Sequence, residues 1–124
     1  MKILLLEDSI QQQLVIESSL RQWLGSCVLI TTNLLESALE ISKELEVDGA
    51  ILDCQTPDNR SFCGLSLLTE YLEEKHTPYV VYTNDDLIAS TVGDVIYKGN
   101  VMTLVKVVRS WKEKHARMSR IEGG

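Results

Sequence analysis

Residues 3–8 read Ile-Leu-Leu-Leu-Glu-Asp, an apolar run that leads directly into two acids. A compact apolar run without polar alternation is typical of a strand that is buried on both faces of a sheet. Further short runs, rich in apolar or β-branched residues, predict strands at Cys27–Thr31, Gly49–Leu52, Tyr79–Tyr82 and Asp94–Tyr97. The chain therefore carries several buried strands, and each of them is short.

Segments with helical spacing of apolar residues separate these runs. The first helix is predicted to place Ile16, Leu20, Trp23 and Leu24 on one face and to end at Gly25. Asn33 and Glu36 resemble a capping box that opens the second helix. In the later helices the shared faces are Leu34, Ala38, Ile41 and Leu45, then Leu65, Leu68 and Leu72, and finally Val101, Leu104, Val105 and Val108 after a cap at Asn100.

A further segment, Asp85–Val92, could form one to two helical turns, and a polar loop surrounds Pro57. Strands that alternate with helices build a mainly parallel sheet with helices on both faces. The sequence thus predicts an α/β fold, with five strands and a helical segment after each of them.

Length and composition limit the class of protein. The chain has 124 residues, of which 44% are hydrophobic and 24% charged, and this balance fits one globular domain. No apolar run approaches the ~20 residues that span a bilayer, and the first residues lack the long apolar stretch of a secretory signal. An odd number of cysteines without paired spacing, Cys27, Cys54 and Cys63, indicates free thiols and no zinc site. We expect a cytoplasmic protein with no membrane segment.

Charge is unevenly distributed along the chain. The formal net charge is −6, which makes direct binding to nucleic acid improbable. Most of the basic side chains nevertheless lie after residue 97: Lys98, Lys106, Arg109, Lys112, Lys114, Arg117 and Arg120. These cations fit a solvated helix whose dipole they offset, and contact with an acidic partner remains an alternative.

Polar side chains follow four of the predicted strands. Glu7 and Asp8 end the first strand, Asp53 the third, Thr83 the fourth and Lys98 the fifth. Because ligands of open α/β sheets bind at the carboxyl ends of the strands, we expect these side chains to share one crevice. Clustered carboxylates repel one another, and a divalent cation offsets that repulsion. Oxygen ligands of this kind suit Mg²⁺.

Such a set of side chains fits phosphoryl transfer. A carboxylate beside Mg²⁺ can attack phosphorus and become an aspartyl phosphate. A lysine and a hydroxyl can then bind the remaining phosphoryl oxygens. Each residue alone is more often a turn or cap residue, so their joint placement at strand ends carries the interpretation.

The set resembles the signature of response-regulator receiver domains, and the resemblance covers nearly the whole chain. It is carried by Glu7-Asp8, Asp53, Pro57, Gly64–Leu68, Thr83 and Lys98. The resemblance implies a flavodoxin-like, doubly wound, five-stranded parallel sheet of the (βα)5 type. We expect residues 1–120 to form the receiver domain and 121–124 to form a flexible tail.

The family's chemistry can be assigned to individual positions. The resemblance implies that Asp53 accepts a phosphoryl group from a phosphohistidine, and that Thr83 and Lys98 contact that group. It implies a Mg²⁺ site formed by Glu7, Asp8, Asp53 and the backbone carbonyl of Gln55. The implied donor is a sensor histidine kinase or a phosphotransfer protein, and phosphorylation switches binding to a downstream protein. Such a domain is not an enzyme, is a monomer or weak homodimer, and assists its own phosphorylation and dephosphorylation.

The sequence departs from the family pattern in three places. Gly99 stands where a proline after a cis bond is usual, so the Lys98–Gly99 bond can be trans. Val95 occupies the position of a switching aromatic, and Tyr97 should point to the face opposite Lys98. Only 14 residues separate Thr83 from Lys98, which leaves room for only a short fourth helix.

Two other functions compete with a phosphoacceptor. A pseudo-receiver would keep the fold and bind a partner without phosphorylation, as the short fourth helix and the missing aromatic suggest. A hydrolase that forms an aspartyl phosphate commonly needs an acid two residues after the nucleophile. That position is Gln55, which disfavours the hydrolase.

Overall fold

The computed structural model describes residues 1–53, 62–83 and 95–123. The strands are β1 (Lys2–Leu6), β2 (Val28–Thr32), β3 (Gly49–Leu52), β4 (Tyr79–Thr83) and β5 (Val95–Tyr97). The helices are α1 (Ile10–Leu24), α2 (Leu35–Glu44), α3 (Phe62–Glu74) and α5 (Val101–Gly123). The predicted loop around Pro57 and the predicted turns within 85–92 lie outside the described residues.

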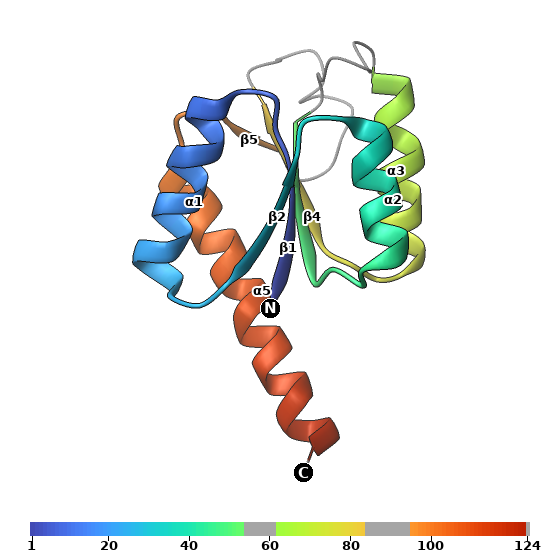
Figure 1. The fold of residues 1–124 in the computed structure, drawn as a ribbon. Helices are drawn as coiled ribbons and strands as arrows, with labels where there is room; N and C mark the ends of the chain where they lie inside the picture. The colour runs from blue at the N-terminus through green and yellow to red at the C-terminus, as the bar shows by residue number, and fades with distance from the viewer. Residues whose placement is uncertain (54–61, 84–94, 124) are drawn as a thin grey trace.

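The strands form one parallel sheet in the order β2-β1-β3-β4-β5. Helices α1 and α5 cover one face of this sheet, and α2 and α3 cover the other (Figure 1). The predicted flavodoxin-like, doubly wound α/β fold is therefore confirmed. A helix between β4 and β5 would fall on residues outside the described part, so that element stays a prediction.

Strand β1 faces two separate hydrophobic cores. Ile3 and Leu5 pack into the core beneath α1 and α5, whereas Leu4 and Leu6 pack into the core beneath α2 and α3. All of them are at most 1% exposed. A polar residue at any of these positions would enter one core or the other, which explains why the run shows no alternation.

Helix α1 follows its predicted face with one exception. Ile16, Leu20 and Leu24 are buried, but the prediction for Trp23 was wrong, because its side chain is 49% exposed. The buried residues are four apart and therefore stack along one line of the helix. Trp23 precedes Leu24 by one residue, a rotation of about 100° that turns it away from the sheet.

The start of helix α2 also differs from the prediction. The capping box expected at Asn33 and Glu36 is wrong, because the N-cap residue is Leu34, which has no side-chain oxygen. Instead, the hydroxyl of Thr32 accepts a hydrogen bond from the Leu34 backbone N–H at 3.3 Å. Because the helix begins one residue later than predicted, Glu36 is only two residues after the N-cap and no longer has the spacing of a capping box.

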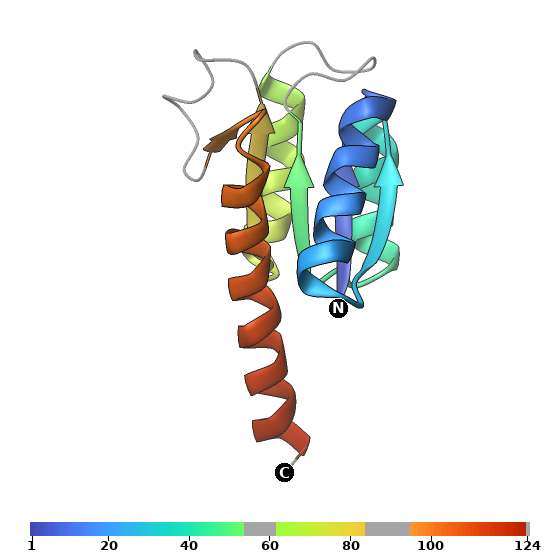
Figure 2. The same ribbon diagram turned by 90° about the vertical axis from the view of Figure 1, so that its left-hand side faces the viewer.

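Helix α5 extends well beyond the sheet, as both ribbon views show (Figures 1 and 2). Its first half is anchored by Leu104, Val105 and Val108, which are fully buried, as predicted. The helix continues to Gly123, and the division into a receiver domain at 1–120 and a flexible tail at 121–124 stays a prediction. Among the described helices, none has the length and apolar content needed to cross a membrane.

The start of β3 lies directly against an aromatic ring of α5. A Cβ atom built on Gly49 would lie 2.5 Å from Cε3 and 2.8 Å from Cζ3 of Trp111. Both residues are buried, and Trp111 is only 8% exposed. The missing side chain of Gly49 therefore lets α5 approach the sheet closely.

We predict that Gly49→Ala destabilises the protein by about 1–3 kcal/mol, the usual cost of overpacking a core. Urea denaturation measures the change in the free energy of unfolding. The control is the same substitution in a Trp111→Leu background, where the smaller side chain should reduce the loss. An equal loss in both backgrounds would show that Trp111 is not its cause.

Candidate functional site

The site residues are fixed by backbone hydrogen bonds that continue the sheet one residue past the strands. The N–H of Glu7 donates to the carbonyl of Thr32 at 3.0 Å, and that of Asp53 donates to Leu6 at 2.8 Å. The N–H of Lys98 donates to the carbonyl of Thr83 at 3.0 Å. Each side chain therefore leaves the same edge of the sheet from a position with little freedom.

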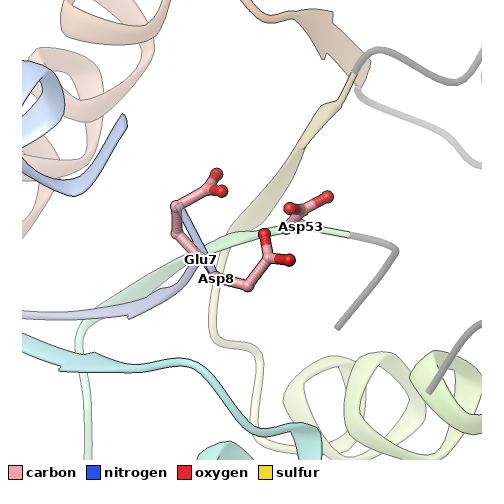
Figure 3. A group of neighbouring side chains, drawn as sticks. All are labelled: Glu7, Asp8 and Asp53. Carbon is pink, nitrogen blue, oxygen red and sulfur yellow. The ribbon is translucent and has the colours of Figure 1, made fainter. Parts of the chain in front are cut away.

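This edge brings three acids together, as predicted. Ligand oxygens of Glu7, Asp8 and Asp53 lie within 4.8 Å of one another. Figure 3 shows the three carboxyl groups gathered above the ends of β1 and β3. Glu7 and Asp53 are 1% and 5% exposed, whereas Asp8 is exposed. The cluster has a buried side and an open side.

The ammonium of Lys98 lies between the two buried acids. Its Nζ is 3.0 Å from Oε1 of Glu7 and 3.0 Å from Oδ2 of Asp53. The Lys98 side chain is only 13% exposed. Because the amine is turned toward the acids, the predicted convergence of the strand ends holds for Glu7, Asp53 and Lys98.

Burial and neighbouring charge change the ionisation of this group. Burial is the main reason why the pKa of Glu7 rises to about 7, and the charge of Asp53 raises it further. Hydrogen bonds from Lys98 and from the Ser9 backbone act in the opposite direction. For Lys98, burial is the largest influence and lowers the pKa, but bonds to Glu7 and Asp53 outweigh it, so the pKa is raised. Near neutral pH, Glu7 is therefore only partly ionised.

Other predicted site residues have different outcomes. Thr83 is buried at the end of β4, and its carbonyl accepts from Lys98. Gln55 lies outside the described residues, so its carbonyl remains a predicted ligand. Tyr97 is 41% exposed while its neighbour Ile96 is 7% exposed, which agrees with the predicted direction of Tyr97.

Two contacts around Glu7 were not predicted from the sequence. The Ser9 hydroxyl is the N-cap of α1 and accepts from the Gln12 N–H, while the Ser9 N–H donates to Oε1 of Glu7 at 3.1 Å. The Gln13 side-chain amide donates to the Glu7 carbonyl at 2.7 Å. A serine directly before a helix was the available signal for the cap.

The turn after β5 has the backbone that a glycine permits. No cis peptide bond occurs in the described ranges, so the bond between Lys98 and Gly99 is trans. Gly99 has φ of 105°, a conformation that residues with a Cβ atom rarely adopt.

The donor set fits a hard divalent cation. Carboxylate oxygens from Glu7, Asp8 and Asp53 are the ligands that Mg²⁺ prefers, and Mg²⁺ usually keeps several waters beside one or two carboxylates. The exposed carboxylate of Asp8 leaves one side of the cluster open to such waters. A cation here would also reduce the repulsion between the acids.

We predict that two substitutions move the pKa of Glu7 in opposite directions. Asp53→Asn removes a repelling charge, so the pKa should fall below 7 while burial keeps it above its ordinary value. Lys98→Met removes an attracting charge, so the pKa should rise above 7. NMR titration of the Glu7 side-chain carboxyl carbon in metal-free buffer measures both changes.

Asp48→Asn is the matched control, because Asp48 pairs with His115 away from the cluster. It should leave the titration unchanged. A shift of the same sign in Asp53→Asn and Lys98→Met would contradict the charge balance described above.

Comparison with known proteins gives matches only among solved structures. No family model and no curated protein matches the sequence. A signal receiver domain from Vibrio parahaemolyticus matches with a TM-score of 0.71 at 19% identity, over 99% of this chain and 97% of that chain. The response regulatory domain of protein mrkE from Klebsiella pneumoniae matches with a TM-score of 0.72 at 18% identity, over 91% and 99% of the two chains.

A third match is the Mn(2+)-bound form of response regulator Rcp1. Its TM-score is 0.69 at 23% identity, over 88% of this chain and 91% of that chain. Sequence identities this low establish likeness of fold. The chain therefore has the fold of a response-regulator receiver domain.

Proposed function

We propose that this chain is a signal receiver that accepts a phosphoryl group on Asp53. The observation that carries the proposal is the position of the Lys98 ammonium, 3.0 Å from both Asp53 and Glu7. A lysine held against a buried carboxylate supplies a cation where a phosphoryl oxygen will arrive. The donor is the phosphohistidine of a sensor histidine kinase or of a phosphotransfer protein.

The transfer forms one bond and breaks another. A carboxylate oxygen of Asp53 attacks phosphorus, and the bond from phosphorus to the donor imidazole nitrogen breaks. The imidazole leaves with the electron pair and takes a proton. Mg²⁺ held by Glu7, Asp8, Asp53 and the Gln55 carbonyl would neutralise phosphoryl oxygens when bound. Lys98 binds one phosphoryl oxygen, and the hydroxyl of Thr83 binds another.

A phosphoryl group on Asp53 would change the charge balance that holds the Lys98 ammonium against Glu7 and Asp53. Once Asp53 is phosphorylated, Lys98 can exchange its contact with the carboxylate for one with the phosphoryl oxygens. This exchange is the local event that would alter binding of a downstream protein. In this role the chain is a cytoplasmic signalling domain, a monomer or weak homodimer, rather than an enzyme that turns over a separate substrate.

One feature favours a second function, that of a pseudo-receiver. Val95 stands where receivers of this fold commonly have a switching aromatic, and strand alternation puts the 41% exposed Tyr97 on the face opposite Lys98. A module without the switch would bind its partner constitutively. Its binding would then be indifferent to Mg²⁺ and to a phosphodonor, which separates it from the first proposal.

We predict that acetyl phosphate and Mg²⁺ together add one phosphoryl group to the protein, detected by intact-protein mass spectrometry. Chelation of Mg²⁺ should abolish the gain. Asp53→Asn should also abolish it, because the amide is not a nucleophile, and Lys98→Met should slow it by roughly tenfold or more, as loss of a transition-state contact does.

The matched control is Asp48→Asn, an acid near the start of β3 rather than at its end. It should take up phosphate at the wild-type rate. Uptake that persists in Asp53→Asn would refute Asp53 as the acceptor, and no uptake by the wild-type protein from acetyl phosphate or from a cognate kinase would favour the pseudo-receiver.

We predict that Mg²⁺ binding releases protons near neutral pH. The pKa of Glu7 is about 7 without metal, so below that pH the cation must displace a proton. Affinity for Mg²⁺ should therefore rise with pH and level off above pH 7. Calorimetry in buffers of different ionisation enthalpy measures the protons released.

Glu7→Gln is the informative variant, because its amide cannot titrate. The variant should bind Mg²⁺ with little dependence on pH between 6 and 8 and release almost no protons. Equal proton release by the variant and the wild type would mean that another group titrates.

A further inference from the structure

Lys98 stands on a tight turn between β5 and α5. The N–H of Asn100 donates to the carbonyl of Tyr97 at 3.1 Å, so Lys98 and Gly99 are the central residues of a β-turn. The positive φ of Gly99 fits the third position of a type II turn. Strand β5 has only three residues, so its ladder gives this turn little support.

A buried tyrosine contacts the turn. The hydroxyl of Tyr82 accepts a hydrogen bond from the Gly99 N–H at 3.0 Å. Tyr82 lies on β4 opposite Ile96 of β5, and its side chain is only 1% exposed within the core beneath α1 and α5. A buried hydroxyl needs a partner, and this one finds it at the residue after Lys98.

The turn is therefore held on both sides of Lys98. On one side, the N–H of Lys98 bonds to Thr83 of β4 at 3.0 Å. On the other side, the N–H of Gly99 bonds to the Tyr82 hydroxyl from the same strand. Lysine has a long flexible stem, so a fixed backbone limits where its ammonium can reach.

We infer that Tyr82 is a positioning residue for Lys98: its hydroxyl anchors the turn that aims the ammonium at Asp53 and Glu7. The inference rests on the proposed function only in its second part, the effect of Lys98 on phosphate uptake. The contact between Tyr82 and the turn does not depend on that function. An apolar ring of the same size would fill the core equally well. The hydroxyl group is thus the part of Tyr82 that acts on the site.

The first test removes that oxygen with Tyr82→Phe and observes the side-chain ammonium of Lys98 by ¹H–¹⁵N NMR without any phosphodonor. Ammonium protons held by two acids exchange slowly with water. Loss of the anchor should speed their exchange by about three- to tenfold, the effect of one lost hydrogen bond. Amide spectra of the same sample verify the fold.

The matched control is Tyr79→Phe, which removes a hydroxyl from the same strand. That hydroxyl donates to Glu73 at 2.6 Å and does not touch the turn. It should leave the Lys98 signal unchanged. A second variant, Gly99→Ala, disturbs the same bond from the other side, because alanine disfavours φ of 105°. Gly99→Ala should also speed the exchange of the Lys98 ammonium protons. It replaces Tyr82→Phe as the test variant if Tyr82→Phe does not fold.

The second test measures the rate of phosphate uptake in a double-mutant cycle. Tyr82→Phe should slow uptake by the wild-type protein about three- to tenfold and have no further effect in a Lys98→Met background. Equal slowing in both backgrounds, or unchanged ammonium exchange in folded Tyr82→Phe, would overturn the inference. Because the NMR test needs no phosphate, it still decides the role of Tyr82 if the wild-type protein takes up none.

Discussion

Two buried carboxylates share one ammonium at the end of this sheet, and the rest of the site is arranged around that constraint. Glu7 and Asp53 are too deeply buried to be well hydrated. The single positive charge of Lys98 contacts both acids but cannot neutralise two negative charges. Removal of one partner from such a buried group leaves charge without compensation, which is costly. The group is therefore stable only while its charges stay balanced, and any new charge beside it would change that balance strongly.

The fold provides the rigidity that this balance needs. Parallel strands deliver side chains from distant parts of the chain to one edge, and a ladder hydrogen bond fixes the first residue past each of β1, β3 and β5. Both faces of the sheet are covered by helices, so the strands cannot slide without exposing a core. The site depends on the position of its side chains more than on any unusual chemical group.

The sheet and the placement of its acids could be predicted from the sequence, because apolar runs mark the strands and their alternation with helices indicates a parallel sheet. The runs ending at Glu7, Asp53 and Lys98 sufficed to place those residues at one edge. Which helical side chains face the sheet was predicted less well, as the exposed Trp23 shows. The predicted start of α2 was also wrong. The contact of Tyr82 with Gly99 depends on how β4 and a turn meet in space, and neither periodicity nor spacing encodes that meeting.

The two tryptophans report on different parts of the molecule. Trp111 is 8% exposed and packs on Gly49, near the end of the sheet remote from the acids, whereas Trp23 is 49% exposed. Their fluorescence should differ in colour and in access to a soluble quencher such as acrylamide. The Trp111 ring, which α5 itself carries against the sheet, should give the blue-shifted and protected emission, so optical spectroscopy can follow the docking of that helix without any added label.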